Sequence, residues 1–168
     1  MLAPLLVSAL LPLPAALAAP QPTVTFVEGD STLLSGGRAF VPSAGVRLRS
    51  CDALRTGPTA MVQVEFDDGS AILLGPDTRF VFDLSPHGGS GGSAEGAQFL
   101  HSGWAKITAP PRANATAHLI QTPSFDLSIE SGVAVLHMAA AVAQVFVELG
   151  AAAALDTAGQ APAPPGRI

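Results

Sequence analysis

Four histidines and a pair of aspartates are the residues of this chain that could bind a metal. The histidines are His87, His101, His118 and His137. Their spacings are far longer than that of an H-x-x-x-H motif, so they do not indicate a zinc site. Asp67 and Asp68 could contact calcium, but a calcium loop needs more oxygen ligands from nearby positions than this turn offers. We therefore predict that the chain has no metal site.

The sequence lacks the residue arrangements that are typical of covalent catalysis. It contains no G-x-S-x-G segment, and Ser131-Gly132 is not a nucleophile elbow. The glycine-rich segment 85–98 could cradle a phosphate only if a helix with GK[ST] followed it, whereas a strand is expected next. We predict a flexible linker there, and no catalytic residue, no cofactor and no enzymatic activity for the chain.

Three arginines and the single tryptophan are the remaining candidates for ligand binding. Arg47, Arg49 and Arg55 could form an anion-binding stripe, but their alternation with apolar residues is also typical of a half-solvated strand, which is the simpler interpretation. Trp104 could stack on a ligand if it is exposed, although a lone large aromatic residue in a small β-protein more often packs in the core. The net charge of −5, with no basic cluster, argues against a nucleic-acid partner.

The elements that must position these residues are centred on segment 61–84. Alternating apolar residues predict strands at 61–66 and 79–84, and the apolar run 71–74 between two turns predicts a third. Asp-Gly and Gly-Pro-Asp-Thr segments lie between them and predict tight turns. We interpret the unit as a β-meander that organises the rest of the chain.

The Asp68-Gly69 turn is predicted to set the register of the first hairpin in this unit. If Gly69 has a positive φ, a β-branched residue would clash there. We expect Gly69→Val to cost about 1 kcal/mol or more and to lower the unfolding midpoint by several degrees, as thermal unfolding would measure. An unchanged midpoint would mean that this turn does not organise the fold.

Composition supports an all-β fold beyond this unit. The 17 glycines and 15 prolines in 168 residues, with many valines and threonines, disfavour a helical bundle. We expect a small meander-rich sandwich or a short β-solenoid-like stack. Further strands are predicted at residues 23–27, 31–34, 38–41, 46–54, 99–107, 119–123 and 125–136. Cys51 is expected to be buried and unpaired, because it lies between apolar strands.

The turn and strand residues of segment 45–78 resemble a family pattern of the form G-x-x-L-x-x-G-D-x-I-x-T-G followed by F-x-D-G-S-x-L-x-L-x-P-x-S. The matching positions are Gly45, Leu48, Asp52, Leu54, Thr56, Gly57, Phe66, Asp68, Gly69, Ser70, Ile72, Leu74, Pro76 and Thr78, with Gly103 in a later segment. This pattern resembles the FecR domain. Cys51 departs from it, since the family usually has glycine there, and so does segment 130–133, where the family commonly has Arg-Gly-Thr.

The resemblance covers roughly residues 23–155 and implies both structure and function. It implies a final hairpin, with strands at 145–149 and 151–155 and Gly150 at the bend. FecR-type proteins relay the state of an outer-membrane transporter to a membrane-bound anti-sigma segment. Because no second hydrophobic span is found here, the resemblance implies a free-standing, non-catalytic domain that binds an envelope protein as a signalling or scaffold module. A small-ligand or polysaccharide-binding domain is the alternative, and a homo-oligomer is left open.

The two ends of the chain are expected to lie outside the domain. Residues 1–18 are apolar and uncharged and end in Ala16-Leu17-Ala18, which fits a secretory cleavage site. Three prolines interrupt this segment, so we predict a signal peptide and not a membrane span. The expected organisation is a signal peptide at 1–18, a FecR-like β-domain at 19–155 and a disordered Pro/Ala tail at 156–168, in a periplasmic or secreted protein without a membrane span in its mature chain.

Overall fold

The structure, a computed structural model, describes residues 22–84, 96, 98–111, 117–139 and 142–156. All the regular elements in this part are β-strands, so the all-β prediction is confirmed. No helix that could cross a membrane occurs among these residues. The predicted signal peptide, most of the glycine-rich segment and the tail after Asp156 lie outside the described residues.

The strands follow one another along the whole described chain. They are β1 (Thr23–Glu28), β2 (Ser31–Ser35), β3 (Arg38–Phe40), β4 (Asp52–Thr56), β5 (Met61–Glu65), β6 (Ala71–Leu74), β7 (Arg79–Phe82), β8 (Gln98–Ala109), β9 (His118–Gln121), β10 (Phe125–Ala139) and β11 (Val142–Asp156). Strands β8, β10 and β11 are much longer than the others.

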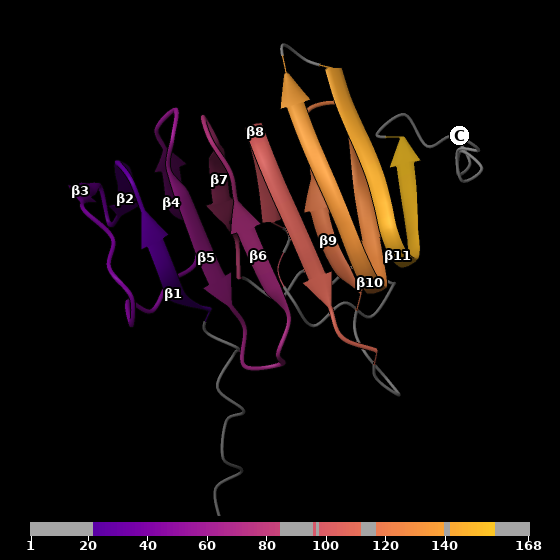
Figure 1. Cartoon of the computed structure of the whole chain (residues 1–168), viewed down its shortest axis with the longest axis horizontal. Helices are drawn as coiled ribbons and strands as arrows, with labels where there is room; N and C mark the ends of the chain where they lie inside the picture. Colours follow the sequence, from indigo (N-terminus) through magenta and orange to yellow (C-terminus); the bar gives the residue numbers. More distant parts are fainter. Residues whose placement is uncertain (1–21, 85–95, 97, 112–116, 140–141, 157–168) are drawn as a thin grey trace, which may run out of the picture.

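A single sheet contains all these strands and curls into a half-barrel. Its order is β1-β5-β6-β8-β7-β4-β2-β3, and β10 extends it by pairing with β8, β9 and β11. Figure 1 shows β1, β5 and β6 in front and β2, β3, β4 and β7 behind, which we call the front and back layers. Pairing is antiparallel except between β8 and β9.

The long strands connect the two layers because they take part in both. The first half of β8 pairs with β7 at residues 98–102, and its second half pairs with β6 at 105–108. The change occurs at Gly103, whose φ is 90°. Strand β10 likewise pairs with β9 at 126–129 and with the second half of β8 at 132–138. The curl of the sheet therefore depends on strands that bend.

The hydrophobic core lies between the layers and is formed by the inward-facing residues of both. Alternate residues of β5, β6, β7 and β8 are buried, as the period-2 pattern predicts. The largest fully buried side chains are Phe80, Phe82, Leu48, Leu54, Ile72, Leu74, Leu100, Ile107, Ile120, Leu127, Ile129 and Leu136. Burying each contributes roughly 1.5–3 kcal/mol of hydrophobic stabilisation, so this core holds the curled sheet together.

The predicted meander is confirmed in its first half and wrong in its second. Strands β5 and β6 form an antiparallel hairpin, and Gly69 has a φ of 80° in its turn. Strands β6 and β7 do not pair, because β8 lies between them in the sheet. Strand β6 pairs with the second half of β8, and β7 pairs with the first half. The segment Gly75–Thr78 thus leads the chain from the front layer to the back layer.

The predicted hairpin about Gly150 is also wrong, although the bend is present. Strand β11 is continuous and pairs with β10 along its length, from Phe125↔Asp156 to Ala139↔Val142. Gly150 and Gly132 face each other with φ values of 86° and 114°. A Cβ on either glycine would overlap backbone atoms of the other strand. The two strands therefore bend together, and segment 151–155 pairs with β10 instead of with 145–149.

The strand predicted at residues 46–54 is shorter, and the burial predicted for Cys51 is wrong. Strand β4 begins only at Asp52 and ends at Thr56. Residues 46–49 lie outside the strands apart from one isolated bridge, Thr23↔Arg47, and Ser50 and Cys51 form a turn. Cys51 is exposed and unpaired. Its φ is 68°, and its backbone N–H donates to the carbonyl of Phe82 at 2.7 Å. This turn directs the thiol away from the core.

Replacing Cys51 with glycine is expected to stabilise the protein. A residue with a Cβ in the left-handed region costs roughly 1–2 kcal/mol, and glycine removes this strain while adding some freedom to the unfolded chain. We expect a net gain of about 0.5–1 kcal/mol in the free energy of unfolding, as denaturant titration would measure. Cys51→Ala is the control, since it removes the thiol but keeps the Cβ. Equal gains in both variants would contradict the role of φ.

Candidate functional site

The Asp-Gly-Ser part of the family pattern forms the turn between β5 and β6. The Asp68 carboxylate accepts hydrogen bonds from the Ser70 backbone N–H, at 2.8 Å, and from the Ser70 hydroxyl. Backbone bonds also join Phe66 and Ser70, at 2.9 Å, and Gly69 and Phe66, at 2.8 Å. The aspartate and the serine thus close the turn, and the glycine supplies its positive φ.

Pattern residues and their neighbours from three distant segments meet where β6 leads to β7, in what we call the Thr78 corner: Thr56, Gly57, Gly75, Pro76, Thr78, Gly103 and Trp104. The Thr78 hydroxyl donates toward the carbonyls of Trp104 and Pro76, at 3.0 and 3.1 Å, and accepts the Trp104 N–H at 2.8 Å. The Thr56 hydroxyl accepts the Thr78 N–H at 2.8 Å and donates to the carbonyl of Gly75 at 2.6 Å. The corner is a buried hydrogen-bond network that joins the layers.

The first part of the pattern shapes the loop before β4. Gly45 has a φ of 90°, and Leu48 is fully buried. The carboxylate of Asp52 is buried and accepts the backbone N–H of Arg49 at 2.9 Å. The pattern residues Gly45, Leu48, Asp52, Thr56, Gly57, Phe66, Asp68, Gly69, Ser70, Pro76 and Gly103 therefore lie in turns and in the core. Their arrangement supports the architecture.

One serine, one histidine and one aspartate do come together, but not as a catalytic triad. The Nε2 of His118 lies 3.5 Å from Asp68 Oδ2, and its ring packs edge-on against Phe66. The Ser70 hydroxyl donates to the same carboxylate. Both His118 and Ser70 are almost completely buried. A nucleophile needs access to substrate and a base that takes its proton, and this serine has neither.

The histidines that are described lie on three different strands. His101 is near the bend of β8, His118 begins β9 and His137 lies near the end of β10. No group of three His, Cys, Asp or Glu residues suited to a metal occurs in the part of the chain that the structure describes. His87 lies outside that part.

His101 is expected to lose its proton at a lower pH than a free histidine. Burial lowers the pKa of His101, and the nearby Arg79 guanidinium lowers that pKa further. Because the folded state then binds fewer protons, this group lowers stability as the pH falls through and below the ordinary value near 6.5. We expect Arg79→Gln to move the pKa of His101 part of the way back, as NMR titration of the ring protons would show. The same pKa in both proteins would exclude the Arg79 effect.

Strand β11 forms an open edge of the sheet. It spans 15 residues and, among the described residues, pairs only with β10. Its far side thus offers a long row of backbone donors and acceptors for another strand. Up to Ala154 its only charged side chain is Glu148. Natural edge strands are usually short or guarded by charges and prolines, and β11 has few of these features.

Apolar side chains are exposed on both faces of this edge. Phe146 and Leu149 are 55% and 68% exposed, and their cross-strand neighbours on β10 are Val135 and Val133. Val147 lies opposite the buried Ala134 and is still 40% exposed. The core is therefore incompletely covered beside β11. Exposed apolar surface of this kind typically marks an interaction site.

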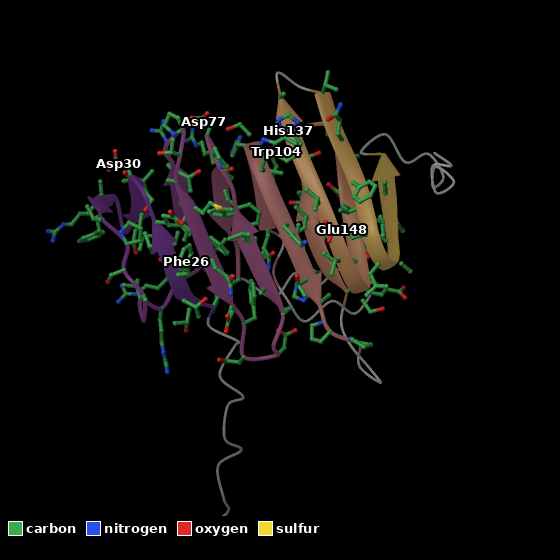
Figure 2. The ribbon with its side chains drawn as sticks, in the orientation of Figure 1. Phe26, Asp30, Asp77, Trp104, His137 and Glu148 are labelled. Carbon is green, nitrogen blue, oxygen red and sulfur yellow. The ribbon has the colours of Figure 1, made fainter. Side chains whose placement is uncertain are left out.

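Trp104 lies on the outer surface and not in the core. It is 43% exposed and stacks on His137, with ring centroids 3.8 Å apart and an interplanar angle of 11°. The two residues are opposite each other on β8 and β10, and Figure 2 shows them side by side. The stack covers one face of the indole. The simpler interpretation of Trp104, as a core residue, is therefore wrong.

The three arginines do not lie on one strand and do not form a stripe. Arg55 is the exposed residue of the half-buried β4, whereas Arg47 and Arg49 precede that strand. Arg47 and Arg49 line one groove together with Arg38, whereas Arg55 lines a separate cavity beside Asp30. Arg38 was not predicted, because it lies in another strand. The open edge of β11 was also missed. Its alanine-rich sequence carried no signal that distinguished an edge strand from a central one.

The comparisons with known proteins agree with the family resemblance. The FecR family model, described as FecR protein, matches residues 52–153. No curated protein and no solved structure matches the chain. The matched region contains β4 to β11 apart from the last residues of β11. Members of this family act in envelope signalling, in the regulation of iron–siderophore uptake, and are not enzymes. The chain belongs to the FecR family.

Proposed function

We propose that this FecR domain is an exported, non-catalytic module that binds a protein partner in the cell envelope as part of a signalling or scaffold assembly. The open edge of β11 carries this proposal. An extended segment of the partner would add a strand to β11, so that its backbone bonds give affinity and alternate side chains give specificity. A periplasmic or secreted location, as expected from residues 1–18, would allow this contact.

The side chains that β11 exposes support the same interaction. A strand added to β11 would lie beside Phe146 and Leu149 and would cover the half-exposed Val147. Lys106 and Glu148 form an ion pair of 2.7 Å beside this apolar surface. Binding would therefore combine removal of apolar surface from water with completion of the open backbone edge. A second copy of the chain is one candidate for the added strand.

The test uses two matched phenylalanine variants. Phe146 lies on β11, and Phe26 lies on β1, where Figure 2 shows it far from Glu148 of β11. Their exposures are similar, at 55% and 44%. A partner is first isolated from envelope extracts with the intact chain and purified. We expect Phe146→Lys to weaken its affinity about tenfold or more and Phe26→Lys to change it less than twofold.

Hydrogen exchange provides the second measurement. Partner binding should slow exchange of backbone amides in β11, because a new strand accepts their hydrogen bonds. Protection confined to other strands, or equal loss of affinity in both phenylalanine variants, would exclude β11 as the binding edge. Sedimentation of the chain alone tests the second-copy case, since self-association through β11 should be lost in Phe146→Lys.

A small-ligand or polysaccharide-binding function is the second candidate, favoured by the exposed Trp104. Aromatic side chains at a protein surface can stack on sugar rings, and one face of this indole is free of His137. Because Trp104 is the only tryptophan, fluorescence reports on it directly. A change in emission on titration with envelope glycans, abolished in Trp104→Ala, would support this function. No change at millimolar glycan would exclude it.

A further inference from the structure

A groove at the end of the sheet opposite to β11 brings together three of the eight lysine and arginine side chains. It lies between the β2–β3 hairpin and the loop that leads to β4, and its volume is about 560 Å³. Its lining includes Arg38, Arg47, Arg49, Asp52, Phe40 and Val41. We call it the arginine groove. Figure 1 shows β3 and β11 at opposite ends of the molecule.

The backbone that carries two of these arginines is held firmly. Leu48 is fully buried between Arg47 and Arg49, and its N–H donates to the carbonyl of Pro22 at 2.8 Å. The N–H of Val24 donates to the carbonyl of Val46 at 2.8 Å. Arg47 and Arg49 flank the buried Leu48 and are both exposed, so both side chains lie on the outer side. The groove is thus built on a fixed loop.

The charge of the groove is unbalanced. Among the described residues, none of the guanidinium groups of Arg38, Arg47 and Arg49 forms an ion pair. Asp52 supplies the single carboxylate of the lining, and it is 2% exposed and already accepts the Arg49 backbone N–H. Three like charges around one cavity repel one another, so an anion in the groove would relieve this repulsion. The excess of two positive charges suits a dianion.

The apolar walls of the groove indicate that the anion is one part of a larger organic ligand. Phe40 is 49% exposed and Val41 is 84% exposed, and both line the cavity with Pro42. Small-molecule sites commonly combine such apolar walls with a few charged groups, in cavities of about 300–1,000 Å³. Arginine forms paired hydrogen bonds with phosphate oxygens. A ligand with a phosphate at one end and an apolar body at the other would match both kinds of surface.

We propose that the arginine groove binds an organic phosphate monoester, with the phosphate dianion among Arg38, Arg47 and Arg49 and the apolar body against Phe40 and Val41. The site is separate from the partner edge at β11. A bound phosphate ester and a bound protein partner can therefore occupy the domain together, and loss of one interaction does not imply loss of the other.

The binding test uses phenyl phosphate as the probe at pH 8, where its phosphate is close to a dianion. Calorimetry and NMR titration of the intact folded chain measure its affinity and its location. We expect binding with shifted amide signals in the groove, weaker binding of benzoate and inorganic phosphate, and none of benzyl alcohol. Benzoate binding as tightly as phenyl phosphate, or shifts confined to other surfaces, would overturn the proposal.

The matched variants test the role of the arginines. Arg47→Gln combined with Arg49→Gln should weaken phenyl phosphate binding about tenfold or more, because charge-assisted hydrogen bonds are lost. Arg79→Gln removes the same charge from an exposed site on β7 outside the groove and should change the affinity less than twofold. Circular dichroism checks that all variants are folded. Equal affinities in the double variant and the wild type would overturn the proposal.

Vesicle flotation, compared with the phenyl phosphate titration, identifies the source of the phosphate ester. Flotation with vesicles of phosphatidylcholine containing phosphatidic acid tests a lipid headgroup, against vesicles of phosphatidylcholine alone. Binding to the first vesicles that is lost in the double arginine variant supports a lipid source. Binding of phenyl phosphate without vesicle binding supports a soluble one, and absence of both excludes the site. Phe146→Lys should leave every affinity in these experiments unchanged, which separates this site from the partner edge.

Discussion

Replacing Gly103 with alanine is expected to lower the free energy of unfolding by about 3 kcal/mol or more. The residue has a φ of 90°, at the point where β8 passes from one layer to the other. A Cβ there would overlap the Cα and Oγ1 of Thr78 and would lie 2.7 Å from the carbonyl oxygen of Asp77. Backbone atoms cannot move aside without opening the Thr78 corner, so steric overlap is added to the cost of the strained φ.

Gly45→Ala is the matched control for this variant. Gly45 also has a φ of 90°, but a Cβ there would meet no atom within 4 Å. Its alanine variant should therefore show the backbone strain alone, about 1–2 kcal/mol. Denaturant titrations of both variants measure the difference. If the two variants lost equal stability, the close approach of Gly103 to Thr78 would have no energetic importance.

Thr78→Val is expected to cost about 2–3 kcal/mol, although valine has almost the same shape as threonine. Thr78 is 2% exposed, and its hydroxyl is the acceptor for the Trp104 N–H. Removing this hydroxyl leaves a buried N–H without its acceptor and also removes the donor toward Pro76 and Trp104. Thermal unfolding should show a loss of several degrees for each kcal/mol in a domain of this size.

Two variants separate this hydrogen-bond effect from a change in shape. Thr108→Val makes the same replacement at an exposed position on β8 and should alter stability by less than about 0.5 kcal/mol. Thr78→Ser keeps the hydroxyl and should retain more stability than Thr78→Val. A serine variant no more stable than the valine variant would show that the methyl group, and not the hydrogen bonds, holds the corner.

Most individual strands could be predicted because their signals are local. Alternation of apolar and polar residues predicted β5 closely, since side chains on a strand alternate between its faces wherever the strand lies, and the two turns that flank it bounded β6. The Asp68-Gly69-Ser70 turn is similarly local, as its carboxylate bonds to a residue only two positions away. The family pattern also predicted which turns matter, but not what they contact.

Cys51 and β11 show where local signals were insufficient. Cys51 lies between apolar segments, yet its left-handed φ and its bond to the carbonyl of Phe82 turn the side chain outward. The alanine-rich β11 was expected to fold back at Gly150. Its true partner is β10, because Gly132 lies opposite Gly150 and lets both strands bend at the same place. A pairing of this kind depends on two segments at once.

By itself, the sequence determined the all-β class, the central hairpin and the turn chemistry of the family pattern, because these depend on residues a few positions apart. Only the tertiary structure decided that β8 lies between β6 and β7, that β11 remains an open edge, and that Arg38 joins Arg47 and Arg49 in one groove. These features follow from pairing between distant strands. A strand's own side-chain pattern states which face is buried, but not which strand lies beside it.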